Sequence, residues 1–269
     1  MDVLYGLHPV EEALKAGRRR FDQVLVSRER HDDRLARLVA DCRQAGVRVR
    51  QESRDQLTEL AGVPTHQGVV AFVRPQELLA LEDLFAPPPG HSTASRLLLA
   101  LDGVEDPQNL GALLRVADGA GVDGVLLTER RSAPLSPAAV KASAGAAEHL
   151  RIVRVVNLVR ALEQLKQHNF WIVGLDERGA SDYDQFDFTG TCVLVLGREG
   201  AGLHDLVRRT CDHLLRIPMA GGVSSLNVST AGAVVLYEAA RQMRRKSQSP
   251  AVPANSRASK PKQQRGLGS

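Results

Sequence analysis

The chain has 269 residues, 43% of them hydrophobic, and a formal net charge of +4 at pH 7, which suits one large globular domain or two smaller ones. The sequence has no uninterrupted run of about 18 apolar residues, the length that a membrane-spanning helix needs, and its first residues lack the apolar core of a secretion signal. We therefore expect a cytoplasmic protein. The three cysteines, Cys42, Cys192 and Cys211, show no C-x-x-C spacing, which argues against a disulfide framework or a metal site.

Residues 1–75 have the pattern of a small α/β domain. Amphipathic periodicity predicts its helices, and short apolar runs predict its strands. We expect helices over 8–17, 31–46 and 53–62, and strands over 21–27, 47–51 and 67–73. This segment contains thirteen Lys or Arg residues and eleven Asp or Glu residues, and several of the Arg lie between residues 18 and 37. Most of them suit a solvated surface, and some could meet phosphates.

Residues 76–95 are predicted to be a linker, because a run of three prolines and the sequence HSTAS have turn and coil chemistry without periodicity. Apolar content then rises abruptly. From 96 to 243 apolar runs alternate with amphipathic segments, which predicts a parallel sheet covered by helices on both faces. We expect strands over 97–103, 122–128, 151–155, 170–176, 191–197 and 213–219, and helices over 106–121, 136–150, 157–169, 201–210 and about 225–243.

The last segment, 244–269, differs in composition from the rest. It carries seven Lys or Arg and no Asp or Glu, so residues 1–243 by themselves have a net charge of −3. The segment has too few apolar residues to form a core, and we expect a disordered basic tail. Any contact between the body of the protein and nucleic acid must therefore come from local patches.

One glycine pattern is misleading. Residues 119–124 match G-x-G-x-x-G, which in a dinucleotide-binding fold follows a strand and opens a helix. Here the pattern follows a predicted helix and precedes a strand, so its glycines are better explained as helix ends. This weakens the hypothesis of a nucleotide-dependent oxidoreductase.

Three other segments carry candidate chemistry. In the helix from Pro107, Asn109 lies in the first turn, where free N–H groups attract anions, and Gly111 lies one turn before Arg115. The missing side chain of Gly111 would let a ligand approach the backbone beside Arg115. An ordinary surface arginine is the competing interpretation.

The second segment, 194–203, runs from an apolar strand into three glycines with Glu199 between them, which suits close approach of a ligand to a strand end. The third segment, 217–240, joins an apolar strand to a glycine loop and then to Ser225 and Asn227 at a helix start. A flexible turn and simple helix caps are the competing interpretations. Together, however, the two loops offer backbone groups and short polar side chains that suit an adenosine or a ribose.

In this order, N-x-G-x-x-x-R, G-x-E-G-x-G-L and I-P-M-x-G-x-V-S-S-L-N-V-S resemble the three motifs of the SpoU (TrmH) family of SPOUT RNA methyltransferases. That resemblance covers 96–243. The segments LYGLHPVEEAL and THQGVVAFV resemble the N-terminal RNA-binding domain of the members that methylate a guanosine of 23S rRNA.

The resemblance implies an α/β catalytic domain with a C-terminal trefoil knot, a homodimer, and 2′-O-methylation of a guanosine ribose in 23S rRNA with S-adenosylmethionine as methyl donor. It places the catalytic residues at Asn109, Arg115, Glu199, Ser225 and Asn227. It places the cofactor-binding residues at Gly197, Ile217, Met219 and Leu226, with no metal.

Several alternatives stay open at this point. Arg115 could act as a base, or, because a guanidinium keeps its proton at neutral pH, as a cation that stabilises the developing alkoxide. The substrate could be tRNA or another rRNA nucleotide. The chain could also bind and shield RNA without catalysis, although the complete set of motif residues argues against this.

Overall fold

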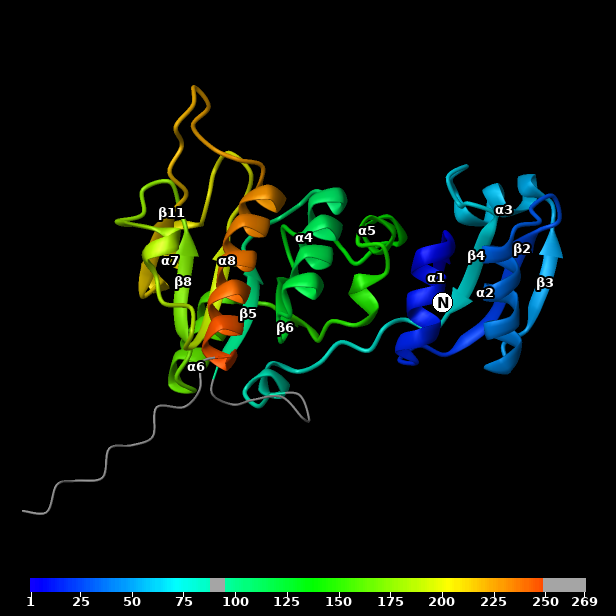
Figure 1. The fold of residues 1–269 in the computed structure, drawn as a ribbon, viewed down its shortest axis with the longest axis horizontal. Coiled ribbons are helices and arrows are strands. Elements are labelled where there is room, and N and C mark those ends of the chain that lie inside the picture. The colour runs from blue at the N-terminus through cyan, green and yellow to red at the C-terminus, as the bar shows by residue number, and fades with distance from the viewer. Residues whose placement is uncertain (88–94, 249–269) are drawn as a thin grey trace, which may run out of the picture.

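The computed structural model describes residues 1–87 and 95–248, which form two α/β domains (Figure 1). The N-terminal domain has a four-stranded sheet in the order β1-β4-β2-β3. Strand β4 is antiparallel to β1 and β2, and β3 is parallel to β2. The elements are β1 (Asp2–Tyr5), α1 (Leu7–Ala16), β2 (Phe21–Ser27), α2 (Asp33–Gln44), β3 (Val49–Glu52), α3 (Arg54–Ala61) and β4 (Val69–Val73).

The second domain is built on a seven-stranded sheet in the order β7-β6-β5-β10-β8-β11-β9, in which every neighbouring pair is parallel. This confirms the predicted parallel sheet. Its strands are β5 (Arg96–Leu101), β6 (Gly124–Thr128), β7 (Ile152–Val155), β8 (Trp171–Leu175), β9 (Ser181–Asp182), β10 (Thr191–Leu196) and β11 (His213–Arg216). Its α-helices are α4 (Pro107–Ala120), α5 (Pro137–Ala142), α6 (Leu158–Gln167), α7 (Asp205–Thr210) and α8 (Val228–Gln248).

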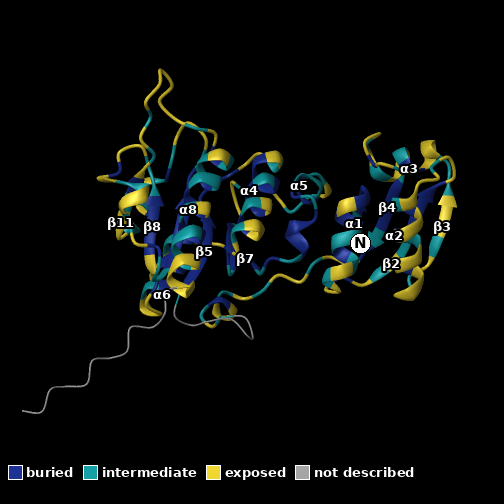
Figure 2. Ribbon diagram, in the orientation of Figure 1, coloured by how far each residue is buried: buried dark blue, intermediate teal, exposed yellow. Residues whose placement is uncertain are grey.

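The interior strand β5 shows why most interior strands of this sheet are apolar runs. All six of its residues are buried (Figure 2). Leu97 and Leu99 pack with α4, α5 and α8, whereas Leu98 packs with α6 and α7. Because successive side chains point to opposite faces, a sheet that is covered on both sides needs an unbroken apolar run rather than an alternating one.

The two domains are joined by a buried ion pair. Arg19, just before β2, donates from Nε to Oε2 of Glu148 at 2.7 Å, and the two side chains are 2% and 0% exposed. Arg19 also donates to Asp2 at 2.8 Å, and Gln76 donates to the carbonyl of Ala147 at 3.0 Å. Glu148 belongs to the 3-10 helix η2 (Ala146–Glu148), so α1 and β1 of the first domain rest on the segment around α5 of the second.

The structure differs from the predicted elements at several places. The helix expected over 136–150 is α5 followed by η2, because Ala144 and Gly145 adopt positive φ values of 53° and 89° and interrupt it. Two short 3-10 helices were not predicted: η1 (Leu81–Leu84), within the predicted linker, and η3 (Tyr183–Gln185). Each is too short to show a periodic pattern in the sequence. The last helix continues to Gln248, five residues into the segment predicted as a tail. Residues 88–94 and 249–269 of the predicted linker and tail lie outside the described residues.

Candidate active site

The three motifs meet at the carboxyl edge of the large sheet. The loop after β5 leads into α4, the loop after β10 carries Glu199, and the segment after β11 leads into α8. Strands β5 and β10 are direct neighbours, so their following loops lie side by side. This edge is where open α/β sheets bind ligands.

Glu199 connects the motifs through its side-chain oxygen Oε1. This oxygen accepts hydrogen bonds from Nδ2 of Asn109, at 2.5 Å, and from Nδ2 of Asn227, at 2.6 Å. Asn227 also donates to Oδ1 of Asn109 at 3.1 Å, which closes a ring of three side chains. Within the described chain, Oε2 of Glu199 has no hydrogen-bond partner, so it stays available to accept a bond from a ligand.

Asn227 both caps helix α8 and bonds to the other two side chains of the ring. Its Oδ1 accepts hydrogen bonds from the backbone N–H and the hydroxyl of Ser229, at 2.9 and 2.6 Å, which caps the start of α8. Its amide nitrogen is thereby turned toward Glu199. The helix-cap interpretation of this residue is therefore correct, and it does not compete with a role in the site.

The loop after β10 requires glycine at two positions. A Cβ at Gly197 would lie 2.3 Å from the backbone carbon of Gly202, so no side chain can be accommodated there. Gly202 has a φ of +66° and exchanges two backbone hydrogen bonds of 3.0 Å with Arg198. The loop is thus folded back on itself, and its tight turn orients Glu199.

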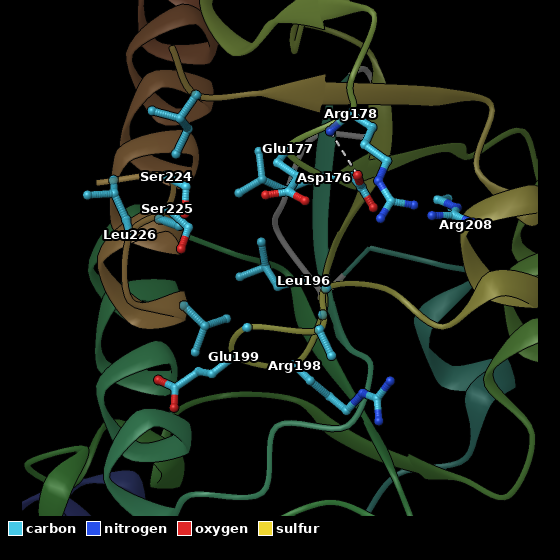
Figure 3. A pocket seen from close by; sticks show the side chains of 18 of the residues that line it. Asp176, Glu177, Arg178, Leu196, Arg198, Glu199, Arg208, Ser224, Ser225 and Leu226 are labelled. Atoms are coloured by element: carbon cyan, nitrogen blue, oxygen red, sulfur yellow. Dashed lines mark hydrogen bonds between the residues drawn. The ribbon is translucent and has the colours of Figure 1, made fainter. Parts of the chain in front are cut away.

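A pocket of about 300 Å³ opens between this loop and the segment before α8 (Figure 3). Its lining includes all four predicted cofactor-binding residues, Gly197, Ile217, Met219 and Leu226, and two of the predicted catalytic residues, Glu199 and Ser225. Leu196 and Val228 add to its apolar wall. Glu199 and Arg198 leave the loop in different directions, Glu199 toward the helices and Arg198 away from them (Figure 3).

Sequence reasoning missed the charged part of this pocket. Asp176, Glu177 and Arg178, which follow β8, line it together with Arg198 and Arg208. Because β8 is paired with β10, its carboxyl end lies next to the glycine loop. The position of Asp176 directly after an apolar strand was the available signal, but no spacing in the sequence says which strands are neighbours.

Arg115 stands apart from the hydrogen-bonded ring. It is exposed on α4 and has no hydrogen-bond or ion-pair partner within the residues that the structure describes. The prediction that Gly111 leaves room for a ligand beside it is wrong. A Cβ at Gly111 would lie 2.4 Å from Cβ of Ala142 and 2.6 Å from the carbonyl oxygen of Ala139, so α5 already fills that space.

The thiols of Cys42 and Cys192 are protonated in their buried positions. Burial raises the pKa of the Cys192 thiol to about 12 and that of Cys42 to about 11, so neither is a thiolate near neutral pH. The described part of the chain has no group of three or more His, Cys, Asp or Glu that could hold a metal ion. It also has no helix long and apolar enough to span a membrane.

Comparisons with known proteins match both domains. Residues 96–237 match the model of the SpoU rRNA methylase family, and residues 3–79 match that of the RNA 2′-O ribose methyltransferase substrate-binding domain. The chain is 43% identical over 244 residues to the 23S rRNA (guanosine-2′-O-)-methyltransferase RlmB of Vibrio vulnificus, which covers 90% of this chain and 97% of the relative.

Solved structures are similar over the same range. The SpoU methyltransferase AviRb from Streptomyces viridochromogenes, in complex with AdoMet, superposes with a TM-score of 0.76 at 28% identity over 90% of each chain. The TrmH/SpoU tRNA modifying enzyme of A. aeolicus superposes with a TM-score of 0.53 at 31% identity, over 57% of this chain and 80% of its own.

Proposed function

The chain belongs to the SpoU rRNA methylase family, and we propose that it transfers the methyl group of S-adenosylmethionine to the ribose 2′-hydroxyl of a guanosine in 23S rRNA. The observation that carries this proposal is the ring formed by Asn109, Glu199 and Asn227, because Glu199 also lines the pocket that contains the four predicted cofactor-binding residues. Two relatives support the two halves of the reaction: RlmB of Vibrio vulnificus is a 23S rRNA guanosine-2′-O-methyltransferase, and the structure of AviRb contains AdoMet.

The pocket suits each part of S-adenosylmethionine. Ile217, Met219 and Leu226 provide an apolar wall for the adenine, and the glycine at position 197 lets the loop after β10 fold back tightly beside that wall. The carboxylates of Asp176 and Glu177 suit the ammonium group or the ribose hydroxyls. When bound, the cofactor supplies a methyl group already activated by its sulfonium.

The difficult part of the reaction is the nucleophile, because a ribose hydroxyl keeps its proton at neutral pH. We assign Glu199, oriented by the two asparagine amides, to hold the substrate hydroxyl through its free oxygen Oε2. Holding the reacting atoms in line supplies roughly 7–11 kcal/mol in well-oriented systems. Ser225, exposed on the pocket wall, is placed to bind the same ribose or its phosphate.

We assign Arg115 to the charge that develops on the ribose oxygen and to the adjacent phosphate. Its guanidinium is exposed and without a partner in the described chain, so it is available to an RNA anion. In a cationic role the arginine keeps its proton throughout, whereas an arginine that acts as a base must first lose its proton. The first role therefore suits an exposed guanidinium that pairs with no side chain in the described part of the protein.

The N-terminal domain favours rRNA over tRNA. The match to the A. aeolicus tRNA enzyme covers 57% of this chain, whereas the match to RlmB of Vibrio vulnificus covers 90%. We infer that residues 1–75 select the RNA and residues 96–243 carry the chemistry, in the cytoplasm where ribosomal RNA is made. A linked binding module raises the local concentration of substrate without touching the reacting ribose.

We also infer the family's trefoil knot and a homodimer for this chain. The knot is supported by the way in which the loop after β10 and the segment before α8 line one pocket. The homodimer is supported by the resemblance and by the exposed, unpartnered Arg115, which a second subunit could orient. Light scattering of the purified protein measures the dimer directly.

One experiment tests the function as a whole. The purified protein is incubated with radiolabelled S-adenosylmethionine and either 23S rRNA or tRNA from cells that lack the enzyme, and the labelled position is mapped. We expect label on one guanosine ribose of 23S rRNA. Label on tRNA would reassign the substrate, and absence of label from both would support a protein that only shields RNA.

A further inference from the structure

A second hollow, of about 250 Å³, lies at the same edge of the large sheet. It is formed by the loops after β5, β6 and β7 and by the starts of α6 and α7. It shares a wall with the cofactor pocket: a Cβ at Gly103, which lines the hollow, would lie 2.8 Å from Cγ of Arg198, which lines the pocket. None of its lining residues belongs to the three motifs.

The hollow carries uncompensated positive charge. Arg130 and Arg131, which follow β6, are both exposed and have no hydrogen-bond or ion-pair partner in the described part of the chain. The one carboxylate among the lining residues is that of Asp102, which already accepts hydrogen bonds from Nδ1 and the backbone N–H of His204, at 2.8 and 2.7 Å. The two guanidinium groups are therefore free to bind an anion from outside the protein.

The same hollow presents apolar side chains and one oriented acceptor. Val156 and Leu206 on its rim are 72% and 67% exposed, so the hollow offers aliphatic contact surface next to the two arginines. Since an ionised Asp102 can only accept, Nδ1 of His204 must donate to it, and a neutral His204 keeps a lone pair on Nε2. No described residue bonds to that Nε2 atom.

We propose that this hollow binds a nucleotide of single-stranded RNA that flanks the methylated guanosine, an inference that rests on the proposed function. Arg130 and Arg131 bind its phosphate, Val156 and Leu206 contact the face of its base, and Nε2 of His204 accepts a hydrogen bond from the base edge. Proteins read RNA sequence mainly from unstacked bases in this way, while phosphate contacts set the register.

Size and position favour a nucleotide over other ligands. The volume lies below the roughly 300–1,000 Å³ usual for pockets that enclose whole small molecules, and it suits a single base. A free inorganic anion would leave the aliphatic rim without a function. Asp102 and Asn109 lie at the two ends of one short segment between β5 and the first turn of α4, so an RNA strand held at Asn109 and Glu199 passes close to the hollow.

The test uses the full-length protein and an rRNA fragment that contains the methylated guanosine. The variant Arg130→Ala/Arg131→Ala is compared with Arg244→Ala, which also removes an exposed, unpaired arginine but lies 17 residues beyond Asn227, roughly 25 Å along α8. We expect the double variant to raise KM for RNA at least ~10-fold with kcat and cofactor affinity almost unchanged. The slope of binding against salt should fall by about 0.7 for each lost phosphate contact.

A second measurement identifies the base. Single abasic residues are placed at each position next to the guanosine. The wild type should lose affinity at one flanking position, and Leu206→Ala and His204→Ala should be insensitive to the base at that same position. If the double variant binds RNA as Arg244→Ala does, or no flanking position is sensitive, the hollow is not an RNA site. Failure of the wild type to methylate rRNA would instead overturn the proposed function.

Discussion

The side-chain amide of Asn227 donates to Oε1 of Glu199 at 2.6 Å, and this single hydrogen bond joins the loop after β10 to the start of α8. Asn109 adds a second donor to the same oxygen, so one carboxylate oxygen gathers three segments that are distant in sequence. The other oxygen, which has no partner in the described chain, is thereby held in a defined position. Such preorganisation costs nothing at the moment of reaction.

We expect Glu199→Gln to lower kcat at least ~10-fold, because an amide loses the negative charge and places an NH2 group, which donates rather than accepts, where Oε2 would receive the substrate hydroxyl. S-adenosylmethionine affinity should change less than about threefold, since the reacting end of the site is altered and the apolar wall is not. Transfer of labelled methyl groups to 23S rRNA measures kcat. Glu163→Gln, an exposed position on α6, is the matched control and should behave as wild type. Equal turnover for the two variants would remove Glu199 from the reaction.

Arg115→Ala should lower turnover at least ~100-fold, the scale of losing one group that stabilises developing charge. Cofactor binding should remain nearly unchanged, because Arg115 is not among the residues that line the cofactor pocket. Arg115→Lys separates two roles: a lysine keeps the charge but loses the bidentate geometry, so partial activity supports charge stabilisation. Turnover like that of the wild type in Arg115→Ala would exclude Arg115 from catalysis.

The cofactor pocket needs a variant that changes its wall without unfolding its loop. Gly197 is unsuitable because any side chain there would strike the backbone of Gly202. Leu226→Ala removes apolar contact from the wall, and we expect the dissociation constant for S-adenosylmethionine to rise about 5–30-fold, from roughly 1–2 kcal/mol of lost burial. Calorimetry measures it. Leu60→Ala, on the surface of α3, is the control. An unaltered dissociation constant in a folded Leu226→Ala protein would mean that the cofactor binds elsewhere.

Gly111 is predicted to be a packing residue. Gly111→Ala should lower the free energy of unfolding by about 1–3 kcal/mol, the usual range for overpacking, because the new methyl group would meet Ala142 and the backbone of Ala139. Gly190→Ala, where no atom lies within 4 Å of the new Cβ, is the control. Urea denaturation followed by circular dichroism gives both values. A Gly111→Ala protein as stable as the control would show that α4 and α5 can move apart at little cost.

The sequence predicted more of the site than of its surroundings. Residues such as Glu199 and Asn227 could be assigned because glycines and small polar residues at strand ends are local signals, and their order in the chain matches a known family. Asp176 could not be assigned in the same way, because its role depends on β8 lying next to β10. Gly111 was misinterpreted for the same reason: the helix that covers it, α5, is a neighbour in space whose position no local pattern contains.

The buried pair Arg19–Glu148 is expected to hold the two domains together. Burial raises the pKa of the Glu148 carboxyl, while Arg19 opposes that rise, so the charge on Glu148 depends on its partner. Glu148→Ala leaves the guanidinium of Arg19 buried with only Asp2 and Gln76 as side-chain partners, and we expect a loss of about 3–5 kcal/mol in unfolding free energy. Replacing both partners with apolar residues, as in Arg19→Met/Glu148→Leu, should recover much of that loss.

The readout distinguishes domain docking from general stability. If the pair fastens the domains, Glu148→Ala should also increase protease cleavage within the segment 76–95 under native conditions, while cofactor affinity stays unchanged. Lys15→Ala removes an exposed partner from a surface pair with Glu12 and should change the unfolding free energy by less than about 1 kcal/mol. Glu148 lies in η2, which follows α5 in the chain, and α5 packs on Gly111 of the catalytic domain. Weakened docking of the N-terminal domain should therefore raise KM for rRNA more than it lowers kcat. A Glu148→Ala protein with unchanged cleavage and unchanged KM would show that the domains act independently.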